Sequence, residues 1–205
     1  MFGTSDMIRV NLSLAIIAIL SSPALALDNT QLQKIEHGCI DETASSSPEE
    51  RISNCNNWID SAPDKLRAKA YYDRGNAYLD VQKLNLAVAD YSHAIILKPD
   101  FKDAWYSRGY ARHDQGNYDQ AIEDYDTALK LTPEDIDSLY GKAYASQKKG
   151  DLDAAIAGYT AVIRLKPDYP TAFYNRAIAY NAKGDTENAT RDALEYERLK
   201  DKNPQ

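Results

Sequence analysis

The feature that most constrains this chain is an internal repeat with a period of 34 residues. When the sequence is shifted by that period, large residues fall on large residues, small on small, and prolines on prolines. The matching columns are Tyr71, Trp105, Leu139 and Phe173; Gly75, Gly109, Ala143 and Ala177; Ala87, Ala121, Ala155 and Ala189; and Pro99, Pro133 and Pro167. A fixed period of this size predicts a stacked array of small units, because one unit cannot bury its apolar face alone.

Each unit contains two amphipathic stretches whose apolar residues follow the helical spacing of i, i+3, i+4 and i+7. Gly116, Gly150 and Gly184 lie in the turns within units, and a proline ends three of the four second stretches. The predicted helices cover residues 68–81 and 84–97, 102–115 and 118–131, 134–149 and 152–165, and 170–183 and 186–200.

The order of a large residue, Gly, Ala, Tyr, Ala and Pro over 34 residues resembles the tetratricopeptide repeat (TPR) family. Four units fit within residues 66–201, at about 68–101, 102–135, 136–169 and 170–201. The pattern weakens where Leu139 replaces the aromatic ring, where Ala193 replaces Tyr and where Asp201 replaces Pro. The resemblance implies an all-α fold, a right-handed α-solenoid of helix-turn-helix repeats that acts as a non-enzymatic protein-interaction scaffold.

Residues 1–26 have the pattern of a secretory signal peptide. Arg9 precedes an apolar run at 10–20, and the small residues Ala24 and Ala26 have the spacing of a cleavage site. The alternative is an N-terminal membrane anchor, although the run is short for a span. We therefore expect an exported protein, periplasmic in preference to secreted, with no membrane span after signal removal; the start is either Met1 or Met7.

Residues 27–65 form a separate N-terminal segment, predicted to be a helical cap with helices at 31–40 and from 48 to about 60. It carries the only cysteines, Cys39 and Cys55. In an oxidising compartment this pair predicts a disulfide that stabilises the fold by about 3 kcal/mol. The alternative is a redox or metal site, for which the nearest histidine is His37 and no C-x-x-C motif is present.

Charged residues recur with the repeat and predict an ion pair between the two helices of a unit. An Arg is followed sixteen residues later by an Asp in three units, as Arg74 and Asp90, Arg108 and Asp124, and Arg176 and Asp192. In the third unit both members change together, to Lys142 and Gly158. A planar guanidinium suits a carboxylate; the alternative is that the charges are independently solvated.

The last unit is polar at two positions that face a following unit elsewhere in the array. Thr190 stands where earlier units have Val or Ile, and Glu197 where they have Ile or Leu. This predicts that the array ends there and that the protein is a monomer.

The resemblance places partner binding on the inner face of the array, which the first helix of each unit lines. The candidate partner-binding residues are Tyr72, Asn76, Tyr106, Tyr110, His113, Tyr140, Tyr144 and Tyr174. Rows of Tyr provide wide contact area with hydroxyl groups for backbone atoms. The alternative is that the rings only pack.

Charge restricts the partner. The net charge of −7 argues against nucleic acid. One branch of the family binds C-terminal carboxylates through a Lys at the position of Tyr72, which this chain lacks. Four acidic residues lie near the same face, Asp73, Asp103, Asp114 and Asp137. A neutral or basic peptide segment is therefore the predicted ligand.

Catalysis has little support in the sequence. His93 lies beside core positions, and His113 with Asp114 could act as a base, but no nucleophile accompanies them. The acidic residues at 119–126 fall on a predicted helix and lack the loop spacing of a calcium site. No cofactor or metal is predicted. The alternative function is a structural accessory subunit of an envelope complex, held through the convex face.

Overall fold

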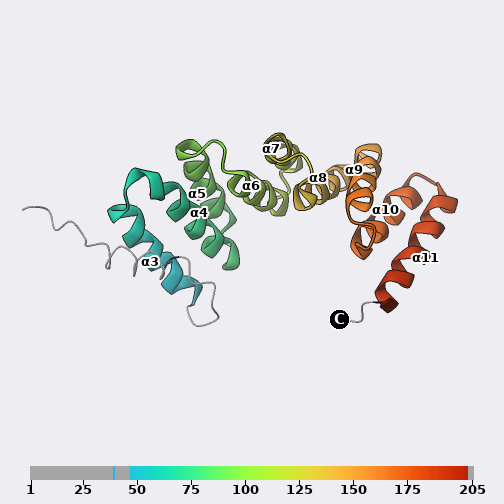
Figure 1. The fold of residues 1–205 in the computed structure, drawn as a ribbon, viewed down its shortest axis with the longest axis horizontal. Helices are drawn as coiled ribbons and strands as arrows, with labels where there is room; N and C mark the ends of the chain where they lie inside the picture. Colours follow the sequence, from blue (N-terminus) through green and yellow to red (C-terminus); the bar gives the residue numbers. More distant parts are fainter. Residues whose placement is uncertain (1–38, 40–46, 203–205) are drawn as a thin grey trace, which may run out of the picture.

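The computed structural model describes Cys39 and residues 47–202, and the residues from 47 onward form a curved row of helices (Figure 1). The helices are α3 (Pro48–Ser61), α4 (Asp64–Asp80), α5 (Leu84–Leu97), α6 (Lys102–Asp114), α7 (Tyr118–Leu131), α8 (Ile136–Lys149), α9 (Leu152–Leu165), α10 (Pro170–Ala182) and α11 (Thr186–Lys202). The all-α fold is confirmed. The expected signal peptide and nearly all of the helix expected at 31–40 lie outside the described residues.

All eight predicted repeat helices are present, and their ends shift for local reasons. The largest shift is at α4, which begins at Asp64 directly after Pro63 instead of at residue 68. Helix α8 begins at Ile136 instead of 134 because Asp135 is its N-cap, and the Asp135 carboxylate accepts a hydrogen bond from the Ser138 backbone N–H at 3.0 Å.

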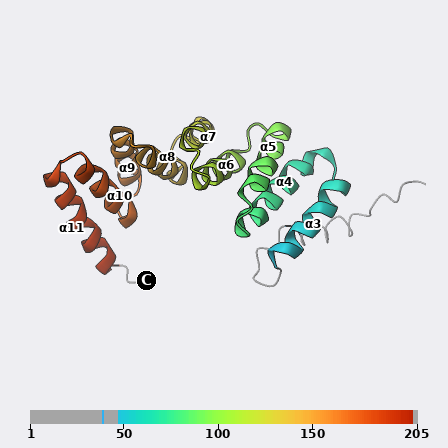
Figure 2. The same ribbon diagram turned by 180° about the vertical axis from the view of Figure 1, so that it is seen from behind.

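The array is curved because the first helices of the units touch one another. Helix α6 contacts both α4 and α8, and α8 also contacts α10, whereas no described second helix contacts another second helix. The front and back views agree that α6 and α8 lie on the inner side of the bend and α7 on the outer side (Figures 1 and 2). The inner side is therefore lined by α4, α6, α8 and α10.

Tyrosines from the second helices fill the space between the two helices of a unit. Tyr91, Tyr125 and Tyr159 are buried, and each ring packs against the first helix. A Cβ at Gly75 would lie 2.6 Å from Tyr91 Cε1, so the close approach of α4 and α5 requires glycine there.

The predicted Arg–Asp pairs are confirmed and join the two helices of three units. Arg108 Nε and Nη2 donate to the Asp124 carboxylate at 3.0 and 2.7 Å, and the same two-bond contact recurs in the first and fourth units. Arg112 Nη1 also donates to Asp124 at 2.7 Å. This third bond was not predicted from the sequence.

The remaining nitrogen of each Arg reaches back to the preceding helix. Nη1 of Arg74, Arg108 and Arg176 donates to Asn56, Ser92 and Thr160 respectively. Lys142 makes the equivalent contact in the third unit, where its Nζ lies 2.6 Å from Asp126 Oδ1. Because Asn56 belongs to α3, this helix occupies the place of a second helix and acts as half a repeat.

Helix α3 is fixed by a cap at its N-terminus and by a buried cluster along its length. Ser47 and Glu50 form a reciprocal capping box at its N-terminus. Cys55 forms a disulfide with Cys39, and both sulfur-bearing residues are buried in a cluster with Trp58 and Ala70. The cluster connects the N-terminal segment to α4.

The last helix is only partly polar on its outer side. Thr190 and Glu197 are exposed, as expected for the end of an array, but Leu194 is also 68% exposed. Within residues 47–202, no helix has the length and apolar character needed to cross a membrane.

Candidate functional site

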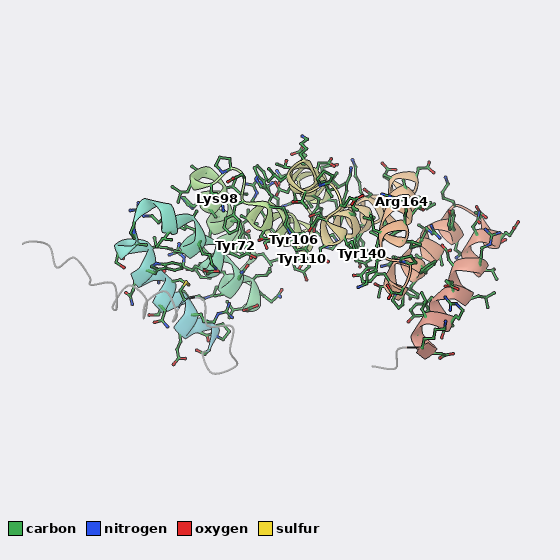
Figure 3. The ribbon with its side chains drawn as sticks, viewed as in Figure 1. Tyr72, Lys98, Tyr106, Tyr110, Tyr140 and Arg164 are labelled. Carbon is green, nitrogen blue, oxygen red and sulfur yellow. A yellow bond between two sulfur atoms is a disulfide. The ribbon has the colours of Figure 1, made fainter. Side chains whose placement is uncertain are left out.

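A pocket of about 450 Å³ opens between α6 and α8 at the middle of the inner face. Figure 3 shows Tyr106, Tyr110 and Tyr140 on this side of the bend, opposite Lys98 and Arg164 on the outer side. The lining residues are Tyr106, Tyr110, His113, Asp114, Tyr125, Asp137, Tyr140, Gly141, Tyr144 and Tyr169. The pocket is therefore aromatic and acidic, and no lysine or arginine lines it.

The structure brings together five of the eight candidate binding residues. Those that line the pocket are Tyr106, Tyr110, His113, Tyr140 and Tyr144. The other three lie elsewhere: Tyr72 packs on Phe101 at 4.9 Å between ring centroids, Asn76 accepts a hydrogen bond from the Tyr91 hydroxyl, and Tyr174 lies against Tyr196. The assignment of these residues to partner binding stays a prediction.

The regular tyrosine column has a packing role as well as an exposed edge. Tyr72, Tyr106 and Tyr140 each tilt against the buried tyrosine of their own unit, at centroid distances of 5.9, 5.8 and 5.7 Å. Tyr110, one turn along α6 from Tyr106, is 43% exposed and has more freedom to contact a ligand. Packing therefore explains three of the tyrosines in the column. It does not explain Tyr110, which is not in the column and is exposed on the inner face.

Three residues that line the pocket were missed in the sequence analysis, Tyr125, Gly141 and Tyr169. Tyr169, in the turn before α10, packs edge-on to Tyr140 with ring centroids 5.6 Å apart. The repeat period aligns Tyr169 with Phe101, which packs on Tyr72, so the period could have identified it. Gly141 lies under the Tyr125 ring, and a Cβ there would be 2.7 Å from Tyr125 Cζ.

The carboxylates of the pocket raise the pKa values of nearby tyrosine hydroxyls. Burial raises the pKa of Tyr106 to about 12, and the charge of Asp137 adds to the effect. The charge of Asp114 is the main cause of the raised pKa of Tyr110. These phenols therefore stay neutral hydrogen-bonding groups at physiological pH.

His113 is held as part of the wall. Its Nδ1 lies 3.1 Å from Asp114 Oδ1, and its ring packs on Tyr144 at 5.0 Å between centroids and on Tyr118 at 5.5 Å. Its Nε2 is buried and has no hydrogen-bond partner among the described residues. A catalytic base would need an accessible nitrogen, so this arrangement favours an aromatic wall. Among the described residues, no three His, Cys, Asp or Glu side chains gather to hold a metal.

Alkaline titration should separate buried tyrosines from exposed ones. Burial raises the pKa of Tyr91, Tyr125 and Tyr159 well above the ordinary value of about 10. The folded state favours the neutral phenols, so their contribution to stability is complete below about pH 10 and is lost as the pH rises further. We expect tyrosinate absorbance to rise in two phases, the second coinciding with loss of helical circular dichroism. A single phase with the helical signal intact would contradict the burial.

Comparison with known proteins agrees with this repeat geometry. A family model described as "Tetratricopeptide repeat" matches residues 72–136, and one described as "TPR repeat" matches residues 147–184. The chain belongs to the tetratricopeptide repeat family. The two matches together cover half of the TPR chain, and the gap between them contains Leu139 and Lys142, where the sequence departs from the repeat pattern.

Solved structures share the fold at low sequence identity. The crystal structure of MamA has a TM-score of 0.72 at 21% identity, covering 76% of this chain and 90% of that one. MamA 41-end from Desulfovibrio magneticus RS-1 has a TM-score of 0.77 at 18% identity, covering 85% and 96%. YrrB, described as a TPR protein with an unusual peptide-binding site, has a TM-score of 0.66 at 21% identity, covering 74% and 77%. No curated protein sequence matches the chain.

Proposed function

We propose that this TPR protein is a non-enzymatic scaffold that binds a segment of a partner polypeptide in its inner groove. The observation that carries the proposal is the tyrosine-lined pocket between α6 and α8, in the middle of the face that the first helices line. Tyrosine rings give a large contact area at low entropy cost, and their hydroxyls can pair with peptide groups. The peptide-binding site named for YrrB, which shares the fold, supports the same kind of ligand.

The charge of the pocket favours a neutral or basic segment and disfavours an acidic one. Asp114 and Asp137 line the pocket without any cationic neighbour in its walls. An acidic peptide or a nucleic acid would bring like charges together, which costs binding energy.

We further propose that the protein works as a monomer in an oxidising compartment, the periplasm in preference to the medium. The buried Cys39–Cys55 disulfide supports export, because disulfides persist in oxidising compartments and are rare in the cytosol.

The test is a cross-linking pull-down from the envelope of the exporting cell with wild type and Tyr110→Ala. Tyr110 is the better residue to change, because Tyr140 contacts three other tyrosines and its hydroxyl accepts a hydrogen bond from Asn175 at 2.5 Å. We expect a partner that is captured by wild type and lost from Tyr110→Ala while the melting temperature stays within a few degrees.

Tyr174→Ala is the matched control for the pocket, because the structure places this candidate residue outside the pocket lining. It removes the same side chain from the inner face, with similar exposure at 49%, but outside the pocket. Retention of the partner by both variants would move the binding surface away from the groove and favour an accessory subunit held through the convex face.

A further inference from the structure

The two carboxylates of the groove pocket lack the cationic partners that most other helical aspartates have. Asp90, Asp124 and Asp192 each pair with an arginine. Within the described part of the chain, Asp114 pairs with no lysine or arginine and its carboxylate lies 3.1 Å from Nδ1 of its neighbour His113, while Asp137 has no ion pair. Both charges are therefore free to pair with a cation from outside.

The tyrosine rings of the pocket also fall into two groups: some have a lysine of this chain over the ring, and others have no cation nearby. Lys148 Nζ lies 5.1 Å from the ring centroid of Tyr144, and Lys166 Nζ lies 5.1 Å from that of Tyr169. Within residues 47–202, no cation lies over Tyr106, Tyr110 or Tyr140. Aromatic faces attract cations, more strongly when water is excluded. The three rings without a cation lie on the helices that carry Asp114 and Asp137, and Tyr110 is the most exposed of them.

We propose that this pocket is a specificity site for one arginine side chain of the bound segment. The proposal rests on the function proposed above and names what the groove selects. The guanidinium would lie against the rings of Tyr106 and Tyr110 and pair with one of the carboxylates at the two ends of the pocket, Asp114 beside Tyr110 or Asp137 beside Tyr106, and with phenol oxygens.

Arginine fits this arrangement better than lysine does. The pocket offers ring faces and several oxygen acceptors, with Asp114 at the end of α6, Asp137 in the first turn of α8 and phenol oxygens between them. A guanidinium has five donors in a flat fork and stacks on rings, whereas an ammonium is a compact, strongly hydrated charge. The chain itself places guanidiniums over rings, as with Arg108 at 4.7 Å from the ring centroid of Trp105.

Asp137 also has a structural role that the experiment must separate from binding. An acidic residue in the first turn of a helix stabilises the helix dipole. Asp103 supplies the matched control, because it holds the same repeat position in the first turn of α6 but pairs with Lys102 and does not line the pocket.

The experiment selects ligands from a random peptide library displayed on phage, with wild-type protein as bait and Tyr110→Ala as the counter-selection. Selected peptides are then synthesised with each arginine replaced in turn by citrulline, its neutral isostere, or by lysine. We expect one arginine at a fixed position, with citrulline weakening binding about tenfold and lysine less. In Asp114→Asn with Asp137→Asn the loss on citrulline substitution should nearly vanish, while Asp103→Asn should behave as wild type.

Raising the salt concentration should reduce the difference between arginine and citrulline, because ions screen a partly exposed charge pair. Selected peptides that bind through Tyr110 equally well with citrulline would overturn the arginine site and leave the peptide groove standing. Failure to enrich any peptide over the Tyr110→Ala counter-selection would overturn both.

Discussion

Replacing Asp124 by alanine should lower the free energy of unfolding by about 3–5 kcal/mol, because the change leaves buried charge without a partner. The Asp124 side chain is almost fully buried and accepts hydrogen bonds from Arg108 and Arg112, at 2.7 Å for the shortest bond of each. Both guanidiniums are mostly buried and would lose their carboxylate together. Urea unfolding followed by circular dichroism measures the loss.

Asp126→Ala, on the same helix, is the control for this prediction. Asp126 pairs with Lys142 at 2.6 Å, but both side chains are more than a third exposed. Such a pair contributes about 0–1 kcal/mol. If Asp124→Ala lowered the free energy of unfolding no more than Asp126→Ala does, the buried pairs of Asp124 with Arg108 and Arg112 would contribute no more to stability than an exposed pair.

Removing the disulfide with Cys39→Ala and Cys55→Ala should lower stability by about 3 kcal/mol in the chain-entropy account. The two cysteines are 16 residues apart and both are buried beside Trp58. We expect the loss to appear first in α3, since its core loses the covalent link to the preceding segment.

Tryptophan fluorescence in a Trp105→Phe background reports on Trp58 alone, because the chain has two tryptophans. The Trp58 signal should change at a lower urea concentration in the cysteine-free protein than in the disulfide-bonded one. An unchanged midpoint would show that packing around Trp58, and not the disulfide, holds the cap.

The repeat period was sufficient to predict the repeat helices and the Arg–Asp pairs, because the same residue type recurs at the same position in several units of one chain. It did not predict the link from Arg74 to Asn56, since the N-terminal segment has no visible repeat pattern and its role as half a repeat appears only in three dimensions. The third bond to Asp124, donated by Arg112, could not be predicted in this way, because only one unit has an arginine at that position.

The limits of the groove could not be predicted from the tyrosine column alone. The sequence treats Tyr72, Tyr106, Tyr140 and Tyr174 as equivalent, but the curvature and the neighbouring loops make their surroundings differ. Phe101 covers Tyr72, whereas Tyr169 meets Tyr140 edge-on and closes one side of the pocket. Which tyrosines share a cavity depends on side chains that differ from one repeat to the next.

The third repeat has a mechanical consequence for the whole array. It lacks the internal Arg–Asp link, and Lys142 is tied instead to Asp126 of the repeat before it, in an exposed pair. Its two helices are held together by packing, with Gly158 against Ala143, and by the hydrogen bond that the Tyr159 hydroxyl donates to Gln147 Oε1 at 2.7 Å. When the ends of the arc are pulled apart or pushed together, we expect the third repeat to deform more than the repeats that have the Arg–Asp link, and this repeat also carries one wall of the pocket. We therefore expect bending of the array to change the width of the pocket between α6 and α8.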